Sequence, residues 1–273
     1  MLSRIGALPG VRRVRDHPAV VRAFALAHLS RLVEGRGRFW LREYLHAPVT
    51  GRYVPRGTGI EVGLRHGTSD LNILVEIFDL GFYEMPDEVR RALGDGPLRI
   101  LDLGGHIGLF GAWALSRFPH AEVTTLEPDP ANAALLAETV ARYSGPGQWR
   151  LITAAAAAGD GLVPFTAGGF AESRAGGSDT VRVPAVDALE LMREADLVKI
   201  DIEGGEWEIL ADERLAELPF RVMALEYHPH GAPDPDYRAA AHEILHRTGF
   251  TTREIPNPPI GAGMLWAWRV PPC

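Results

Sequence analysis

Three glycines stand directly behind a short apolar strand. Gly104, Gly105 and Gly108 follow the predicted strand over residues 100–103 and lead into an apolar helix. Backbone without a Cβ atom lets a ligand approach closely where a strand turns into a helix. The spacing differs from the G-x-G-x-x-G of dinucleotide sites, and Asp102 would repel a diphosphate at close range. The stretch therefore favours a cationic ligand such as S-adenosylmethionine (SAM), which carries an ammonium and a sulfonium group.

A second acidic position follows the next predicted strand. Glu127 and Pro128 come directly after residues 122–126, and an acid at this place accepts hydrogen bonds from ribose hydroxyls in nucleotide-binding sheets. After the third strand, the small side chains of residues 154–158 leave room for an adenine ring, with Ala156 at their centre. A packing surface of small residues would show the same pattern. We assign Glu127, Pro128 and Ala156 to the cofactor site.

A group of charged residues is expected at the end of a later strand. Lys199, Asp201 and Glu203 share one side of the chain over residues 196–203, because side chains alternate along a strand. Charged groups on one side of a central strand are costly unless they are paired or line a cleft. The pattern is therefore consistent with an ion pair that holds the turn, and also with a functional site nearby.

A histidine follows the next strand, over residues 220–227. Glu226 and His228 share one side of that strand, and they lie beside Asp201 and Glu203 if the two strands are neighbours. A histidine next to carboxylates at a sheet edge is a candidate general base or metal ligand.

Strands and helices alternate from about residue 98 onward, which predicts an α/β fold around a mostly parallel sheet with right-handed crossovers. The strands are expected at 99–103, 122–126, 149–155, 196–202, 220–227, 251–255 and 264–270, and the helices at 107–117, 130–143, 186–193, 206–217 and 236–247. The last two strands lack an intervening helix, so one of them is expected to run antiparallel. Residues 161–166 and 180–183 are expected to pair around a loop, 167–179. Ligands bind such a sheet beyond the carboxyl ends of its strands, where the residues above are expected.

Three regions are expected along the chain: a basic N-terminal helical extension (1–57), a hairpin and helical cap (58–97) and a cofactor-binding domain (98–273). The extension carries a net charge of +8 and the remainder −15. Its helices are expected at 18–33 and 39–46, and a hairpin over 52–54 and 60–62 follows. Thr68 or Ser69 caps a helix over 70–80, whose first residue, Asp70, we also place over the cofactor. A short helix is expected at 86–93.

Composition excludes several classes of protein. The 273 residues carry a net charge of −7 and one cysteine, Cys273, which excludes an intrachain disulfide framework and a cysteine-based zinc site. No apolar run is long enough for a membrane span or forms the core of a signal peptide, so we expect a cytoplasmic protein. The acidic charge argues against nucleic acid as a partner. The basic extension either binds an acidic substrate, a membrane surface or the acidic body of a partner subunit, as in a homo-oligomer, or packs on the domain with its arginines in solvent, which we favour.

The motifs together resemble the FkbM family of SAM-dependent methyltransferases over about residues 60–270. The matching pieces are T-S-D-L from Thr68, L-D-L-G-G-H-I-G-L-F from Leu101, L-E-P-D-P-A-N from Leu126, V-D-A-L from Val186, L-V-K-I-D-I-E-G-G-E-W-E-I-L from Leu197 and E-Y-H-P from Glu226. The resemblance implies a class I methyltransferase (Rossmann-like) fold with a seven-stranded sheet and helices on both faces. It also implies methyl transfer from SAM, commonly to a hydroxyl oxygen of a natural product or sugar.

The sequence departs from the family pattern in three ways. His106 stands where the family often has Asn, and Gly105 and Gly205 stand where Ala is usual. The family commonly has an Asp or a Ser-Asp after the third strand, and this sequence has Ala157-Ala158 there. The residues that recognise adenine therefore differ from the family pattern at this place.

Methyl transfer from a sulfonium is an in-line displacement, to which a protein contributes positioning and desolvation. A hydroxyl acceptor must also lose its proton. We assign His228 or Asp201 as the base and Glu203 as the residue that orients the small-molecule acceptor; Asp201 also belongs to the cofactor site. We assign no metal, although a divalent ion on these residues and Glu226 is an alternative.

Two other functions are alternatives to methyl transfer. One is a non-catalytic SAM-fold binding subunit. The other is a nicotinamide-dependent oxidoreductase, which the glycine spacing disfavours.

Overall fold

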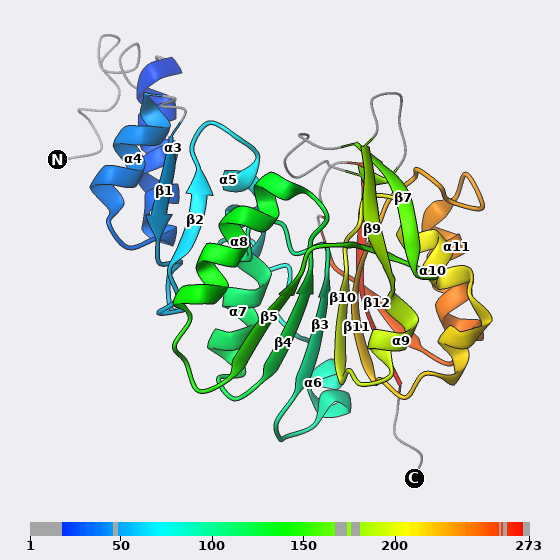
Figure 1. Cartoon of the computed structure of the whole chain (residues 1–273). Coiled ribbons are helices and arrows are strands. Elements are labelled where there is room, and N and C mark those ends of the chain that lie inside the picture. The colour runs from blue at the N-terminus through cyan, green and yellow to red at the C-terminus, as the bar shows by residue number, and fades with distance from the viewer. Residues whose placement is uncertain are drawn as a thin grey trace, which may run out of the picture.

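The computed structural model describes residues 18–45, 49–166, 174–175, 181–256, 258 and 261–269. Its centre is a seven-stranded sheet in the order β12-β13-β11-β10-β3-β4-β5 (Figure 1). The strands are β3 (Arg99–Leu103), β4 (Glu122–Leu126), β5 (Gln148–Ile152), β10 (Leu197–Ile200), β11 (Val222–Tyr227), β12 (Thr251–Glu254) and β13 (Gly263–Trp268). β13 runs antiparallel to both neighbours and the other pairings are parallel, so the predicted mostly parallel sheet is confirmed.

Helices cover both faces of this sheet (Figure 1). Ile100 of β3 is buried in one apolar cluster together with residues of α7, whereas Leu101 and Leu103 belong to a second cluster on the opposite face. A strand that is buried on both faces is expected to be mostly apolar, which explains the apolar runs in β3, β10 and β11; the charged residues within them are Asp102, Lys199 and Glu226. The first cluster includes residues of α5 (Asp70–Phe78), α6 (Asp87–Leu93), α7 (Leu109–Arg117) and α8 (Pro130–Arg142), and the second those of α9 (Ala188–Met192), α10 (Glu206–Ala211), η3 (Glu213–Glu217) and α11 (Tyr237–Arg247).

The single helix predicted over 206–217 is wrong, because the chain breaks between α10 and η3. Asp212 adopts an extended conformation there, and its carboxylate accepts a hydrogen bond from the backbone N–H of Arg214. An aspartate that caps the next turn in this way competes with helix continuation.

A four-stranded sheet lies over the carboxyl ends of the central strands, in the order β6-β9-β7-β8 (Figure 1). It consists of β6 (Ala155–Ala157), β7 (Gly161–Thr166), β8 (Arg174–Ala175) and β9 (Val181–Asp187). The predicted pairing of the segments around 161 and 183 is confirmed by the antiparallel β7 and β9. The expected loop over 167–179 lies outside the described residues except at 174–175. The strand predicted over 149–155 is wrong at its end, because β5 stops at Ile152 and the chain turns into β6.

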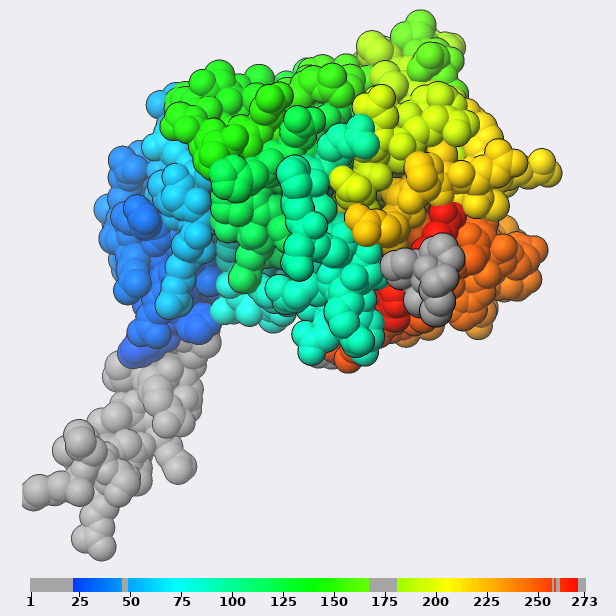
Figure 2. Space-filling model, turned by 90° about the horizontal axis from the view of Figure 1, so that it is seen from below, coloured from blue at the N-terminus to red at the C-terminus, as the bar shows by residue number. Residues whose placement is uncertain are grey.

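The N-terminal part forms a layer at the end of the molecule opposite α11 (Figure 2). It consists of α3 (Pro18–Leu29), η1 (Ser30–Leu32), α4 (Arg36–Tyr44) and the antiparallel hairpin of β1 (Thr50–Tyr53) and β2 (Val62–Arg65). Buried His66 links α4 to the hairpin, because its ring nitrogens lie 2.8 Å from the Glu43 carboxylate and 2.7 Å from the Tyr53 hydroxyl. Phe39 is buried in the same apolar cluster as α7, so this layer is continuous with the core. Among the described residues, no helix has the length and apolar character needed to cross a membrane.

Candidate active site

A cavity opens at the carboxyl ends of β3, β4 and β10, against the small sheet. Six residues that the sequence assigns to a site line it: Gly104, Glu127, Pro128, Ala156, Asp201 and Glu203. Larger hollows lie elsewhere, including one between α10 and α11, but neither Gly104 nor Glu127 lines them. The predicted position of the site, at the carboxyl edge of the parallel strands, is therefore where a cavity is found.

The chain turns after β3 at Gly104, Gly105 and Gly108, and we call this segment the glycine turn. Each position needs glycine for a different reason. Gly104 has a φ of +83°, and a side chain there would also collide with the carbonyl oxygen of Asp201. Gly105 and Gly108 do not line the cavity, contrary to the expectation that they face the cofactor. A Cβ atom on Gly105 would collide with Thr125, and one on Gly108 would press on a leucine of α8. These two glycines let the turn pack closely on β4 and α8.

Asp102 is fully buried and does not line the cavity, and its contact with the cofactor stays a prediction. One of its carboxylate oxygens lies 3.3 Å from the Nζ of Lys199, and the other accepts a hydrogen bond of 3.2 Å from Thr125. Lys199 also donates a hydrogen bond of 2.6 Å to the carbonyl oxygen of Gly104 and lies 3.4 Å from Asp201. Burial favours the neutral amine of Lys199, but the Asp201 and Asp102 carboxylates outweigh it and raise its pKa. The ion pair that holds the turn therefore exists and includes Asp102.

Glu127 lines the cavity with a carboxylate that two backbone groups hold in place. One oxygen accepts a hydrogen bond of 2.7 Å from the N–H of His106, and the other accepts one of 2.8 Å from the N–H of Asp129. Burial raises the pKa of Glu127 to about 7, although these hydrogen bonds oppose the shift. The oxygen bound by Asp129 also accepts a hydrogen bond of 3.4 Å from the side-chain amide of Asn132, whereas the oxygen bound by His106 keeps a second lone pair for a ribose hydroxyl.

Asp70 is also fully buried and does not line the cavity, and its assignment to the cofactor stays a prediction. Arg65 donates to its carboxylate through the backbone N–H at 2.8 Å and through the guanidinium at 2.8 and 3.0 Å, and His106 lies 3.3 Å away. Burial alone would raise the pKa of Asp70, but the hydrogen bonds from His106 and Arg65 outweigh it and lower the pKa to about 2. Asp70 thus contacts the ring of His106, which does line the cavity and has a positive φ of +50°.

An apolar wall closes the cavity on the side of the small sheet. Ala155 and Ala156 of β6 line it together with Phe165 of β7. The run of small residues was expected at this place, but Phe165 was not, because it lies in a strand that carries no motif. Asn132 was missed as well; its position in the first turn of the helix after Glu127 is the signal that could have found it.

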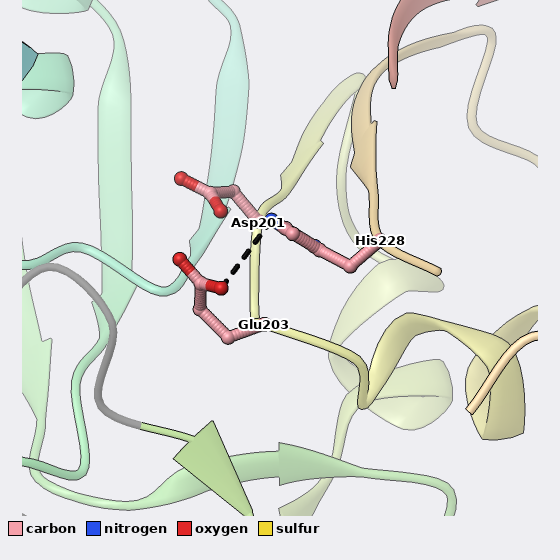
Figure 3. Close-up of side chains that lie close together, drawn as sticks. All are labelled: Asp201, Glu203 and His228. Atoms are coloured by element: carbon pink, nitrogen blue, oxygen red, sulfur yellow. Dashed lines mark ion pairs between the residues drawn. The ribbon is translucent and has the colours of Figure 1, made fainter. Parts of the chain in front are cut away.

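Asp201, Glu203 and His228 converge beside the cavity from the ends of β10 and β11 (Figure 3). Their ligand atoms all lie within 4.8 Å of one another. The Nε2 of His228 lies 3.4 Å from Glu203 and 3.7 Å from Glu226. β10 and β11 are adjacent and parallel, as the sequence argument assumed. We call Asp201, Glu203 and His228 the acidic cluster; their catalytic roles stay a prediction.

Glu206, the first residue of α10, fixes the histidine of the acidic cluster. One oxygen of its fully buried carboxylate accepts a hydrogen bond of 2.7 Å from the backbone N–H of His228 and lies 3.1 Å from the Nδ1 of the same residue. The other oxygen accepts a hydrogen bond of 2.7 Å from the N–H of Gly204. The imidazole is thereby oriented with Nδ1 toward Glu206 and Nε2 toward Glu203 and Glu226.

Negative charge is concentrated around the acidic cluster. Burial and repulsion by Asp201 and Glu203 raise the pKa of Glu76, on α5, to about 7. Burial and repulsion by Asp201 likewise raise the pKa of Glu226 well above its ordinary value. Burial favours the neutral imidazole of His228, but the neighbouring carboxylates outweigh it and raise its pKa to about 9. These shifts reflect how closely the carboxylates are grouped around His228.

Solved structures that the chain resembles include distantly related methyltransferases. A precorrin-6y C5,15-methyltransferase from Geobacter metallireducens is 15% identical, with 66% of this chain and 84% of the other covered and a TM-score of 0.40. A SAM-dependent methyltransferase from Agrobacterium tumefaciens is 15% identical, with 81% and 70% covered and a TM-score of 0.44. Fibrillarin from Aeropyrum pernix, in complex with natively bound SAM, is 15% identical, with 64% and 68% covered and a TM-score of 0.40.

No curated protein matches the sequence. A family model, the methyltransferase FkbM domain, matches residues 102–251, which is more than half of the chain. This stretch begins at Asp102 in β3 and includes the glycine turn, Glu127 and the acidic cluster. The resemblance stated from the motifs is thereby confirmed. The chain belongs to the FkbM family of SAM-dependent methyltransferases.

Proposed function

We propose that this chain transfers the methyl group of SAM to a hydroxyl oxygen of a small acceptor, such as a natural product or a sugar. One observation supports the proposal above others. Asp201 and Glu203 line the same cavity as the glycine turn and Glu127. A cofactor site and carboxylates that are able to accept a proton therefore open into one hollow.

The cofactor roles follow from the contacts of the cavity. Glu127 accepts hydrogen bonds from the ribose hydroxyls, because its two oxygens are held by backbone N–H groups and face the cavity. The backbone at Gly104 lies against the amino-acid part of SAM, since no side chain covers it. Ala156 and Phe165 enclose the adenine, because apolar contact suits an aromatic ring.

The reaction breaks the bond between sulfur and the methyl carbon as the bond from the acceptor oxygen forms. S-Adenosylhomocysteine leaves as a neutral thioether, and the hydroxyl proton passes to a carboxylate of the acidic cluster. Of the two residues predicted as base, Asp201 lines the cavity and His228 does not. We therefore assign the proton to Asp201 and the orientation of the acceptor to Glu203.

Calorimetric titration of the purified chain with SAM, S-adenosylhomocysteine and NAD tests the first part. We expect the first two to bind and NAD not to bind. Transfer of an isotope-labelled methyl group from SAM to a panel of hydroxylated small molecules, with a matched panel of amines, tests the second. We expect the label in ethers of the hydroxylated panel. Label confined to the amines, or no transfer to either panel, would refute the assignment to oxygen.

A further inference from the structure

We propose that His106 binds the carboxylate of the amino-acid part of SAM through its Nδ1 atom. The residue lines the cavity, as Gly104 does, and only 8% of its surface is exposed. Its Nδ1 is buried and has no hydrogen-bond partner among the described residues. A buried polar atom without a partner is costly, so one at the wall of a ligand cavity indicates a ligand group that completes it. The inference rests on the proposed placement of the amino-acid part of SAM at the glycine turn.

The backbone of the glycine turn has already used the donors nearest to this place. The N–H groups of Gly104 and Gly105 both donate to the carbonyl oxygen of Leu126, at 3.0 and 2.9 Å. The N–H of His106 donates to the carboxylate of Glu127. A ligand carboxylate that lies on this part of the turn therefore has to find its donor in a side chain.

The side chains of the cavity leave His106 as that donor. Among the described residues that line the cavity, it carries the only basic side chain. The amide of Asn132 is used at both ends, since its oxygen accepts a hydrogen bond from Arg65 and its nitrogen donates one to Glu127. The charged side chains of the cavity are otherwise carboxylates, which suit the ammonium group of SAM and repel its carboxylate.

The opposite nitrogen of the imidazole is held by two residues that do not line the cavity. Nε2 of His106 lies 3.3 Å from the carboxylate of Asp70 and 3.2 Å from the guanidinium of Arg65. Nδ1 carries a proton in the imidazolium, whose Nε2–H donates to Asp70, and in the neutral ring whose Nε2 accepts from Arg65. An anion at Nδ1 stabilises both of these forms. The ring is thus fixed at one nitrogen and able to donate from the other.

Two substitutions separate the roles of the two ring nitrogens. The side-chain amide of His106→Asn lies near the position of Nδ1, whereas the longer side chain of His106→Gln brings its amide near the position of Nε2. Asparagine also adopts the φ of +50° at this residue readily. If Nδ1 binds the ligand, the Asn variant keeps more of the affinity. If the ring acts only through Asp70 and Arg65, the Gln variant keeps more of it.

Calorimetry with S-adenosylhomocysteine and its decarboxylated analogue, S-adenosyl-3-thiopropylamine, tests the inference on the full chain. The two ligands share the adenosine, the thioether and the amino group and differ only in the carboxylate. We expect the wild type to bind S-adenosylhomocysteine about tenfold or more tightly than the analogue, because a charge-assisted hydrogen bond is lost with the carboxylate. His106→Gln should lose this preference and bind the analogue like the wild type, and His106→Asn should retain part of the preference.

His120→Gln is the matched control, because His120 is an exposed histidine before β4 and does not line the cavity. It should bind both ligands like the wild type. Circular dichroism verifies that each variant is folded. His106→Gly accepts the positive φ and lacks both ring nitrogens, so it takes the place of the Gln variant if that one does not fold.

Equal loss of affinity for both ligands in His106→Gln, or no loss for either, overturns the inference, because the imidazole would then not act on the carboxylate. Higher affinity of the Gln variant than of the Asn variant for S-adenosylhomocysteine overturns it too, since Nε2 would then carry the effect. The proposed function fails separately. If methyl groups reach a hydroxyl oxygen and the His106 variants bind like the wild type, only the inference is wrong. If the carboxylate preference depends on His106 but no hydroxyl is methylated, only the proposed function is wrong.

Discussion

The ammonium group of Lys199 donates a hydrogen bond of 2.6 Å to the carbonyl oxygen of Gly104 and lies 3.3 Å from the carboxylate of Asp102. One buried side chain of β10 therefore holds the glycine turn that follows β3 and neutralises the acid within that strand. Because Lys199 also lies 3.4 Å from Asp201, it joins the cofactor side of the cavity to the acidic cluster.

Replacing Lys199 should destabilise the chain strongly. Lys199→Met leaves Asp102 as an unpaired charge in the core, which costs roughly 3 to 5 kcal/mol in the free energy of unfolding. The double variant Lys199→Met/Asp102→Asn should regain part of this loss, because it removes the unpaired charge. Urea unfolding of the three proteins measures both effects. A loss below about 1 kcal/mol in the single variant would show that the pair does not hold the turn.

The ion pair of Asp70 should depend on pH in the acid range. Its pKa is lowered from 3.8 to about 2 in the folded chain, so its contribution to stability is present above pH 4 and is lost as the pH falls toward 2. Asp70→Asn should therefore lower the free energy of unfolding by roughly 2 kcal/mol at neutral pH. The difference from the wild type should shrink at pH 3. An equal difference at both pH values would contradict the assignment.

SAM affinity should rise with pH around neutrality because of Glu127. Its pKa is raised to about 7, so the carboxylate form, the stronger acceptor for ribose hydroxyls, becomes dominant above that pH. Calorimetry at pH 6 and pH 8 should show several-fold tighter binding at the higher pH for the wild type. Glu127→Gln should bind about tenfold or more weakly, since it loses a charge-assisted hydrogen bond, and should lack this component of the pH dependence. The variant also serves as the control for the titration of SAM itself.

Filling the apolar wall should weaken cofactor binding without unfolding the chain. Ala156→Leu places a larger side chain in the cavity, and we expect SAM affinity to fall about tenfold or more from steric exclusion. Ala137→Leu is the matched control, because Ala137 is exposed on α8 and does not line the cavity. Equal effects of the two substitutions would show that the adenine does not lie on this wall.

Asp201→Asn should separate chemistry from binding. Loss of a proton acceptor typically lowers the rate of transfer by about 10² to 10⁴-fold, whereas the contacts of Glu127 and Gly104 with SAM stay intact. Single-turnover methyl transfer and SAM calorimetry on the same preparation measure the two effects. A variant with wild-type transfer would remove Asp201 from the mechanism, and one that no longer binds SAM would make it a cofactor residue alone.

The central strands could be predicted closely from sequence, and the reason is their burial on both faces. β3 and β4 have the predicted bounds, because a proline shortly precedes each strand and a turn directly follows it. The end of β5 could not be predicted, since the alanines of 154–158 carry no periodicity that distinguishes the central sheet from the small one. The break at Asp212 was missed because a capping aspartate resembles an ordinary polar residue of a helix surface.

The types of the site residues were predictable, but the directions of two carboxylates were not. Asp102 and Asp70 lie next to the site as expected, yet each is turned toward a cation from another element rather than toward the cavity. Which cation reaches which acid depends on how strands and loops are assembled, and no local pattern contains that information. Asp201, Glu203 and His228 came together as predicted, because parallel strand ends meet at one edge of a sheet.

Lys199 is the only lysine of the chain, and 3% of its surface is exposed. A reagent that acylates primary amines therefore finds no lysine side chain to attack while β3 and β10 stay together. The rate at which such a reagent modifies Lys199 would report how often these two strands separate in the native protein. Modification of Lys199, which holds the glycine turn, would therefore measure local opening at the centre of the sheet.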